Sequence, residues 1–329
     1  MKRFLKRILL IIILILLGLG LCLLTGKSQP AENIKWGVTF SKGYASDFEP
    51  DWQKMFSTIL DDLKVKNFRL IAYWNEIEKE QGKYNFSDLD WQINEVSKRG
   101  GEIILAIGKR LPRWPECHIP EWTNKFSQEE NDESLIAYIR ETINRYKNNE
   151  NIKIWQIENE PFLGTFGVCP KLDKKFLDKE IALVRYLDPS RKIMITESGE
   201  FSTWMGGAKR ADIVGTSVYR TIYGKLGYVT YPIPPVFYQK KTNLIKFLFD
   251  VKRIIGIEIQ AEPWGKNPVK QMSKEESDIS MSFEKFNENI EYAKNTGFDE
   301  MYLWGAEWWY WMKQKGDDSY WNKVKELFK

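Results

Sequence analysis

Short apolar runs alternate with longer amphipathic segments along most of this chain. Each run has the length of a buried strand, and the segments between them carry apolar residues at helical spacing. The predicted strands are residues 36–40, 68–72, 103–107, 152–157, 192–196, 213–217, 257–261 and 301–304. The predicted helices are residues 52–64, 89–99, 133–146, 174–186, 201–209, 244–253, 279–295 and 321–328.

The alternation of strands and helices predicts a parallel sheet built from right-handed strand–helix–strand units. Eight units in about 290 residues match a closed (β/α)8 barrel, the TIM barrel. An open, doubly wound sheet is the structural alternative. It would need a glycine-rich turn after its first strand, and none follows residues 36–40. We therefore predict an α/β protein with a (β/α)8 barrel over residues 35–329.

The N-terminal segment has a different pattern from the rest of the chain. Four of the first seven residues are basic, and an apolar stretch follows at residues 8–24. This order is typical of a secretory signal peptide or an uncleaved signal anchor. The basic flank predicts that the barrel lies outside the cytoplasm. We expect a membrane anchor over residues 1–26 and a linker over 27–34, or a secreted protein if the signal is cleaved.

Charge and aromatic content restrict the classes of ligand. The formal net charge of +4 equals the four basic residues of the N-terminal segment, so the remaining chain is balanced. This balance disfavours nucleic acid as a partner. The chain has 14 Trp, 15 Tyr and 18 Phe residues. Indole faces suit the C–H faces of sugars, although large cores also use aromatic residues.

Two of the three cysteines fall in the predicted barrel. Cys117 and Cys169 follow neighbouring predicted strands, so both belong to loops at the same end of the barrel. An oxidising compartment would allow them to pair. A disulfide between them is one hypothesis, and two free thiols are the alternative.

Two predicted strands end in the same way, with Asn159-Glu160-Pro161 and with Ala261-Glu262-Pro263. Proline stops the strand ladder and leaves the glutamate at the strand end. The ends of strands four and seven face one another across the mouth of a barrel, where active sites lie. Paired carboxylates are what glycoside hydrolysis requires. A helix cap or an ion pair would explain one such glutamate, but two glutamates that each precede a proline at a strand end favour catalysis.

With these motifs the chain resembles the clan of retaining (β/α)8 glycoside hydrolases, which includes cellulases, mannanases, xylanases and β-galactosidases. The clan carries Asn-Glu after strand four, a nucleophilic Glu after strand seven, Arg on strand two, Tyr after strand six and Trp after strand eight. The matching residues here are Asn159, Glu160, Glu262, Arg69, Tyr219 and Trp304. Residues 74–78 and 82–86 also look like segments of clan members that act on β-linked sugars.

The resemblance implies a double-displacement mechanism. Glu262 would be the nucleophile and Glu160 the acid/base, with Arg69 and Tyr219 holding Glu262 ionised and oriented. Glu160 must begin protonated, so its surroundings should raise its pKa. Glu158 and Glu258 lie within predicted strands, where we interpret them as structural.

The resemblance also implies residues that contact the sugar. Asn159 would bind the 2-hydroxyl, and Trp304 would form the floor of the subsite where the bond breaks. Trp74, Trp264 and Glu197 are further candidates for substrate contacts. Packing is the alternative for Trp264, and a structural role is the alternative for Glu197, which ends a predicted strand.

The expected function is hydrolysis of β-linked oligo- or polysaccharides with retention, by a monomer that needs no cofactor or metal. His118 is the single histidine, so a His-based triad or His-rich metal site has little support. The alternatives are a non-catalytic carbohydrate-binding barrel and a transglycosidase that uses the same site.

Overall fold

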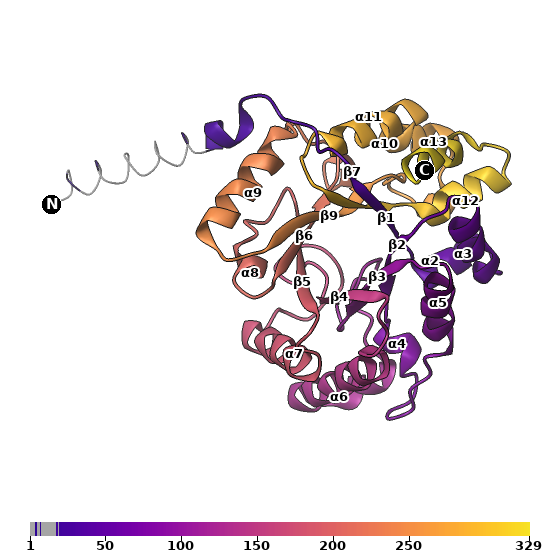
Figure 1. Ribbon diagram of the computed structural model, residues 1–329, viewed down its shortest axis with the longest axis vertical. Coiled ribbons are helices and arrows are strands. Elements are labelled where there is room, and N and C mark those ends of the chain that lie inside the picture. Colours follow the sequence, from indigo (N-terminus) through magenta and orange to yellow (C-terminus); the bar gives the residue numbers. More distant parts are fainter. Residues whose placement is uncertain (1–3, 5–6, 8–17, 19) are drawn as a thin grey trace.

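The computed structural model describes residues 4, 7, 18 and 20–329 (Figure 1). Most of the apolar stretch at residues 8–24, on which the predicted anchor rests, lies outside these described residues. Within the part of the chain that the structure describes, no helix is both long and apolar enough to span a bilayer.

Eight parallel strands close into a barrel in the order β1-β10-β9-β6-β5-β4-β3-β2. The prediction of a (β/α)8 barrel is therefore confirmed. Seven of the eight predicted strands agree with the observed ones to within one residue at each end, and the seventh begins four residues earlier than predicted. The barrel strands are β1 (Lys35–Thr39), β2 (Asn67–Ile71), β3 (Glu102–Ile107), β4 (Ile152–Ile157), β5 (Lys192–Glu197), β6 (Ile213–Val218), β9 (Arg253–Gln260) and β10 (Glu300–Trp304).

Helices surround the barrel (Figure 1). Local sequence explains their bounds: the Ser127 hydroxyl and the Glu130 carboxylate, for example, form a capping box at the start of α6. The helices at the predicted positions are α3 (Trp52–Asp61), α5 (Ser87–Lys98), α6 (Gln128–Tyr146), α7 (Lys174–Leu187), α8 (Met205–Ala208), α9 (Val236–Leu248), α10 (Lys274–Met281), α11 (Phe283–Lys294) and α13 (Ser319–Leu327). Three further helices are α2 (Lys42–Phe48), α4 (Trp74–Ile77) and α12 (Ala306–Gln314).

Two helix predictions need correction. The helix predicted at 244–253 is α9, which begins at Val236 and ends at Leu248 because β9 already starts at Arg253. The helix predicted at 279–295 is divided into α10 and α11 by Ser282. This residue has extended backbone angles, and its hydroxyl caps the second helix. An unpredicted hairpin of β7 (Thr221–Gly224) and β8 (Gly227–Thr230) follows β6.

The barrel interior is filled by side chains rather than open. Its apolar layer packs as a cluster of its own, consisting of Ile104, Ile154, Met194, Ile213, Ile255, Ile257 and Tyr302. A polar layer follows toward the carboxyl ends of the strands, and it includes the buried side chains of Arg69, Gln156 and Glu258. A larger apolar cluster joins the outer faces of the strands to the helices. The packed interior leaves the carboxyl end of the barrel as the place for a site.

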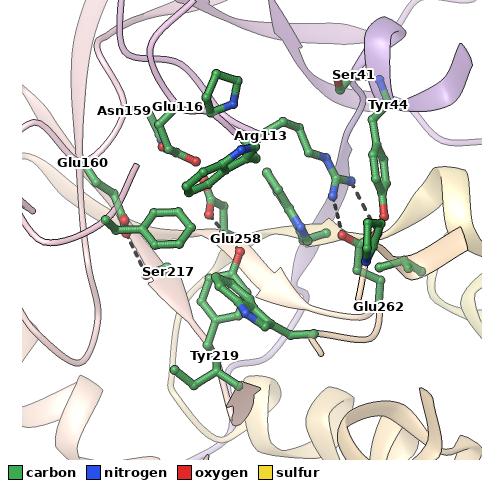
Figure 2. A pocket seen from close by; sticks show the side chains of 18 of the residues that line it. Ser41, Tyr44, Arg113, Glu116, Asn159, Glu160, Ser217, Tyr219, Glu258 and Glu262 are labelled. Carbon is green, nitrogen blue, oxygen red and sulfur yellow. Dashed lines mark hydrogen bonds and ion pairs between the residues drawn. The ribbon is translucent and has the colours of Figure 1, made fainter. Parts of the chain in front are cut away.

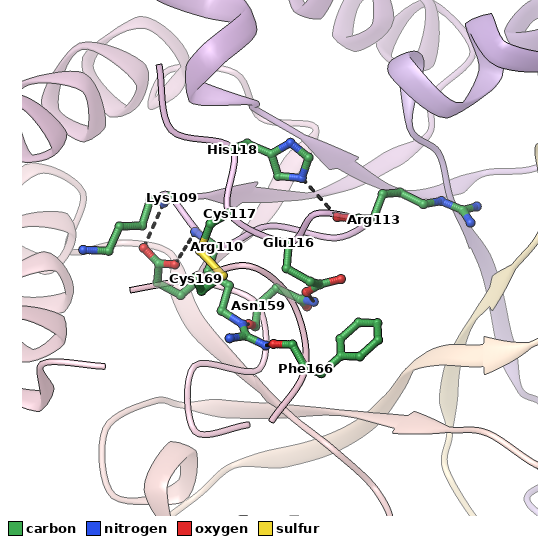
Figure 3. Close-up of a disulfide and its surroundings, with 10 residues drawn as sticks. Lys109, Arg110, Arg113, Glu116, Cys117, His118, Asn159, Phe166 and Cys169 are labelled. Atoms are coloured by element: carbon green, nitrogen blue, oxygen red, sulfur yellow. Dashed lines mark hydrogen bonds between the residues drawn. A yellow bond between two sulfur atoms is a disulfide. The ribbon is translucent and has the colours of Figure 1, made fainter. Parts of the chain in front are cut away.

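A disulfide joins Cys117, in the loop after β3, to Cys169, in the loop after β4 (Figure 3). Their Cα atoms lie 5.2 Å apart. The sequence left open whether these cysteines form a disulfide or remain as free thiols, and in the structure they form the disulfide. The bond fixes two loops of neighbouring strands to each other at the carboxyl end of the barrel.

Candidate active site

A cavity of about 1030 Å³ opens at the carboxyl ends of the barrel strands (Figure 2). Residues that follow β1, β3, β4, β5, β6 and β9 line it. Glu160 and Glu262, the two carboxylates that the sequence predicted there, both reach this cavity. Further carboxylates line it as well, among them Glu258 and Glu116.

Glu258 is the carboxylate that Arg69 and Tyr219 hold. The Nη1 atom of Arg69 donates to Glu258 Oε1 at 2.6 Å, and the Tyr219 hydroxyl donates to Oε2 at 3.1 Å. Glu258 is buried, with an exposed fraction of 5%. We expected Arg69 and Tyr219 to contact Glu262, and this expectation was wrong.

The register of β9 explains why Glu258 faces the cavity. On the β6 side, Thr216 pairs with Gly256 but Ser217 pairs with Glu258, so Ile257 is an extra residue. The pairing with β10 is irregular at the same place. Such a bulge redirects side chains and is common beside active sites. Ile257 packs in the barrel interior and Glu258 lines the cavity, although regular alternation would place them on opposite faces.

Glu160 follows β4 and reaches the cavity from another side (Figure 2). Its Oε1 accepts a hydrogen bond from the Ser217 hydroxyl at 2.9 Å, and its backbone N–H donates to the Thr196 hydroxyl at 2.7 Å. Its φ of 43° is uncommon for a residue with a side chain and is held by these contacts. Burial, and then the negative charge of Glu258, raise the pKa of Glu160 well above its usual value. This agrees with the acid form that the predicted role requires.

Asn159 lies between the two carboxylates in the hydrogen-bond network. Its Oδ1 accepts from Arg69 Nη2 at 2.7 Å and from the Thr196 hydroxyl at 3.0 Å. These donors orient the amide, and its Nδ2 donates to Glu116 Oε2 at 3.1 Å. Burial, and then the charge of Glu258, raise the pKa of Glu116 to about 8. Glu116 was not predicted from the sequence.

Glu262 belongs to a separate group of residues, which we call the Arg113 cluster: Tyr44, Arg113, Glu262, Trp304 and Glu307. The Arg113 guanidinium donates to Glu262 (Figure 2). It also donates to Glu307 at 3.2 Å. Its central carbon lies 3.6 Å from the Tyr44 ring centre and 4.0 Å from that of Trp304. Burial raises the pKa of Glu307 to about 7 despite the Arg113 charge. Trp304 lines the cavity as predicted, but the guanidinium covers part of its ring.

The other predicted sugar contacts divide between the cavity and the protein interior. Trp264 lines the cavity, with its ring centre 5.0 Å from that of Tyr219. Glu197 instead accepts the Gly207 N–H at 2.6 Å, at the adjacent helix α8. Trp74 is buried in α4 and stacks on Tyr138 of α6, with ring centres 5.8 Å apart. Neither Glu197 nor Trp74 lines the cavity. Glu197 has the structural role that was the alternative for it, and Trp74 packs α4 against α6.

Glu158 has the structural role that the sequence indicated. Its carboxylate accepts the backbone N–H groups of Lys109 and Arg110 at 2.9 and 2.6 Å. It thereby holds the start of the loop that carries Arg113 and Glu116. That loop has no periodic pattern, and its length was the one signal that pointed to function.

Comparison with known proteins gives matches to glycoside hydrolases. No family model matches the chain. The chain is 24% identical over 141 residues to the β-galactosidase LacZ of Lactobacillus acidophilus, a match that covers 36% of this chain and 21% of that protein. It is 25% identical over 146 residues to endo-1,4-β-xylanase 1 of Arabidopsis thaliana, covering 41% of this chain and 14% of that protein. The matches thus span only 21% and 14% of these two relatives' length.

Solved structures show the same barrel. The GH5_18 protein of Bifidobacterium longum subsp. longum superposes with a TM-score of 0.59 at 12% identity, over 83% of this chain and 70% of that chain. Gan42B, a GH42 β-galactosidase from G. stearothermophilus, gives 0.58 at 13% identity, over 92% and 57% of the two chains. At these identities the likeness shows a shared fold. The resemblance to the barrel-type glycoside hydrolases is confirmed at that level.

Proposed function

We propose that this protein is a retaining β-glycoside hydrolase in which Glu258 is the nucleophile and Glu160 the acid/base. The observation that carries the proposal is the Glu258 carboxylate, held on both oxygens by Arg69 and Tyr219. A buried Glu160 with a raised pKa opens into the same cavity. This replaces Glu262, the nucleophile expected from the sequence, whose carboxylate is engaged by Arg113.

The two residues complete a double displacement. The Glu258 carboxylate attacks the anomeric carbon while the bond between that carbon and the leaving oxygen breaks. The leaving oxygen takes the proton of Glu160 in the same step. Glu160 then removes a proton from water, whose oxygen attacks the same carbon and releases Glu258. A retaining enzyme predicts a separation of about 5–5.5 Å between the two carboxyl groups in the substrate complex.

The electrostatics of the pair suit both roles of Glu160. In the resting protein the Glu258 charge contributes to the raised pKa of Glu160, which favours the acid form. Esterification of Glu258 removes that charge, so the pKa of Glu160 falls during the intermediate. Glu160 can then act as a base toward water.

A β-linked sugar is the proposed substrate class. The named relatives include a β-galactosidase and an endo-1,4-β-xylanase, and the structural neighbours include an exo-β-1,4-mannosidase and a GH5_18 variant in complex with Manβ1-4GlcNAc. Aromatic side chains suited to sugar rings line the cavity, among them Trp114, Phe166 and Trp264. A panel of aryl β-galactoside, β-mannoside, β-glucoside and β-xyloside covers these possibilities.

Trapping with 2-deoxy-2-fluoro glycosides of the same sugars tests the assignment. We expect a covalent adduct on Glu258, and no adduct in Glu258→Gln. Glu258 and Glu262 lie between Arg253 and Lys266, so tandem fragmentation of the tryptic peptide must distinguish them. An adduct on Glu262 would overturn the assignment, and absence of both adduct and turnover would favour a carbohydrate-binding barrel. Product analysis at high sugar concentration separates hydrolysis from transglycosylation.

We also propose that the barrel works outside the cytoplasm, held to the membrane through residues 8–24. The basic residues before this stretch and the Cys117–Cys169 disulfide support this location. Protease added to intact spheroplasts should digest the barrel, while a cytoplasmic marker protein stays intact. Protection of the barrel would show that the proposed location is wrong.

A further inference from the structure

The segment from Arg113 to Cys117 is fixed at both of its ends. Arg113 is bound to Glu262 and Glu307, and Cys117 is bonded to Cys169 (Figure 3). Between them, Glu116 has a φ of 73°, in the left-handed region. A residue with a side chain stays in this region when its surroundings determine its conformation. The two anchors therefore set the position of the Glu116 side chain.

Glu116 is directed into the cavity at the contact between the two disulfide-linked loops. It lines the cavity but is only 5% exposed. Gly167, two residues before Cys169, approaches it so closely that a Cβ there would lie 2.7 Å from the Glu116 Cβ. Among the described residues, the side-chain hydrogen-bond partner of Glu116 is Asn159. An acceptor oxygen on Glu116 is left over for a ligand, whether the carboxyl is ionised or not.

Arg69 relates Glu116 to the proposed nucleophile. One terminal nitrogen of Arg69 binds Glu258 and the other binds Asn159, at 2.6 and 2.7 Å. The Asn159 amide therefore lies beside the Glu258 carboxylate, and Glu116 is the next group along the network. After burial, the charge of Glu258 is the largest cause of the raised pKa of Glu116, in agreement with this proximity.

The chemistry of a sugar ring limits what can occupy this place. When Glu258 faces the anomeric carbon, the neighbouring ring positions are the ring oxygen and C2. The ring oxygen accepts hydrogen bonds but cannot donate one. A hydroxyl on C2 can accept from the second N–H of Asn159 and donate to Glu116. The Asn159–Glu116 pair is thus complementary to a hydroxyl.

We propose that Glu116 is a substrate-binding residue that accepts a hydrogen bond from the 2-hydroxyl of the sugar bound at Glu258, and that it selects β-glycosides in which this hydroxyl is free. The inference rests on the proposed function and adds the recognition of one substituent to it. Positive charge that develops at the anomeric carbon makes the 2-hydroxyl a stronger donor. The bond therefore strengthens in the transition state and contributes to kcat as well as to binding.

A comparison of two substrates tests the contact. The aryl β-glycoside that the wild type hydrolyses fastest and its 2-deoxy counterpart are assayed with wild type, Glu116→Ala and Glu116→Gln. We expect Glu116→Ala to lower kcat/KM for the parent glycoside about 10- to 100-fold, and that for the 2-deoxy compound less than about threefold. Glu116→Gln should retain more activity than alanine, because its carbonyl still accepts. Equal losses on both substrates would overturn the proposal.

A second variant separates direct contact from an effect through Asn159. If Glu116 binds the sugar itself, Glu116→Ala lowers kcat/KM further in an Asn159→Ala background. No further loss in that background would reduce Glu116 to a residue that orients Asn159, and the proposal would fail.

Glu76→Ala serves as the matched control. Glu76 also lines the cavity, but its carboxylate is paired with Lys42 at 2.8 Å. Its removal should leave the ratio between the two substrates unchanged. Trapping of Glu258 by the fluoro sugar in Glu116→Ala shows that the variant is folded. The trapping experiment also separates the two proposals. If the adduct forms but the loss in Glu116→Ala is the same with and without the 2-hydroxyl, only this inference is refuted. If the wild type gives neither adduct nor turnover, the proposed function is refuted as well.

Discussion

Arg69 donates a hydrogen bond to Glu258 at 2.6 Å inside the barrel, where the two side chains are 0% and 6% exposed. Removal of two charges from water is costly unless each finds good partners. Arg69 has three partners, since its Nε also donates to Gln156 at 2.8 Å and its Nη2 to Asn159 at 2.7 Å. The network orients the Glu258 carboxylate, as its proposed role as nucleophile requires.

The nucleophile can be identified by chemical rescue. We expect Glu258→Ala to lower turnover of an aryl β-glycoside by about 10⁴-fold or more, because no covalent intermediate can form. Azide should restore turnover by entering the space of the lost carboxylate, with an α-glycosyl azide as product.

Glu262→Ala is the matched variant for this experiment. It leaves a buried Arg113 without one of its two carboxylate partners, so we expect a clear loss of thermal stability. Azide should not restore its activity. Rescue of Glu262→Ala but not of Glu258→Ala would reverse the assignment.

The proposed acid/base role of Glu160 predicts that the effect of its replacement depends on the leaving group. Glu160→Gln should lower kcat about 10²- to 10⁴-fold for alkyl β-glycosides, which need a proton on the leaving oxygen. A dinitrophenyl glycoside, whose leaving group needs no proton, should be affected far less in its first step. Similar losses for both substrates would argue against an acid role.

The raised pKa of Glu160 also predicts the shape of the pH profile. Wild-type kcat/KM should fall as the pH rises through this pKa, because the acid form is lost. Glu160→Gln should lack that decline, and a decline of the same size in the variant would assign it to another group.

Glu180 on α7 should make stability depend on pH. Burial, and then the charge of Glu158, raise its pKa well above 4.5. The folded protein keeps this proton, whereas the unfolded chain releases it above about pH 4.5. The stability that the folded protein has from this group is therefore fully present below about pH 4.5, and it is lost as the pH rises through the pKa of Glu180 in the folded protein.

Glu180→Gln removes this titration. We expect its Tm to exceed that of the wild type by roughly 2 °C or more at pH 8, with a smaller difference at pH 4. Calorimetry at the two pH values measures the effect. Glu133→Gln, at an exposed position on α6, is the control and should show no such difference. A Tm of Glu180→Gln below that of the wild type at pH 8 would contradict the prediction.

Reduction of the disulfide should affect both stability and activity. The paired cysteines are 52 residues apart. A disulfide that closes a loop of that length stabilises the folded state by up to about 4 kcal/mol, because it lowers the entropy of the unfolded chain. We expect Cys117→Ser to lower the urea midpoint. It should also lower kcat/KM, since Glu116 loses the adjacent anchor.

Cys22→Ser provides the control, because Cys22 is the free cysteine. It should behave like the wild type under oxidising conditions and respond to reductant in the same way. An unchanged midpoint in Cys117→Ser would show that the loop does not depend on the bond.

Local pattern in the sequence was sufficient for the fold and for one half of the site. Strand and helix periods follow from the geometry of near neighbours in the chain, so the alternation of runs predicted all eight barrel strands. The Asn159-Glu160-Pro161 motif ends a strand by local chemistry as well. It placed both Asn159 and Glu160 at the cavity.

Contacts between distant residues decided the rest. The choice between Glu258 and Glu262 depends on one extra residue, Ile257, in the pairing of β9 with both of its neighbours. A register shift is a property of the closed sheet, and no local period in the sequence reveals it.

The positions of Arg113 and Glu116 could not be predicted from the sequence either, because both residues lie in a loop without a periodic pattern. Arg113 finds its partners 149 and 194 residues further along the chain, and the disulfide fixes the other end of the segment. The sequence by itself thus determined a barrel with Glu160 at the end of strand four. Only closure of the barrel decided which carboxylate shares the cavity with Glu160 and is held by Arg69, because closure set the register of β9 and brought the anchoring loops together.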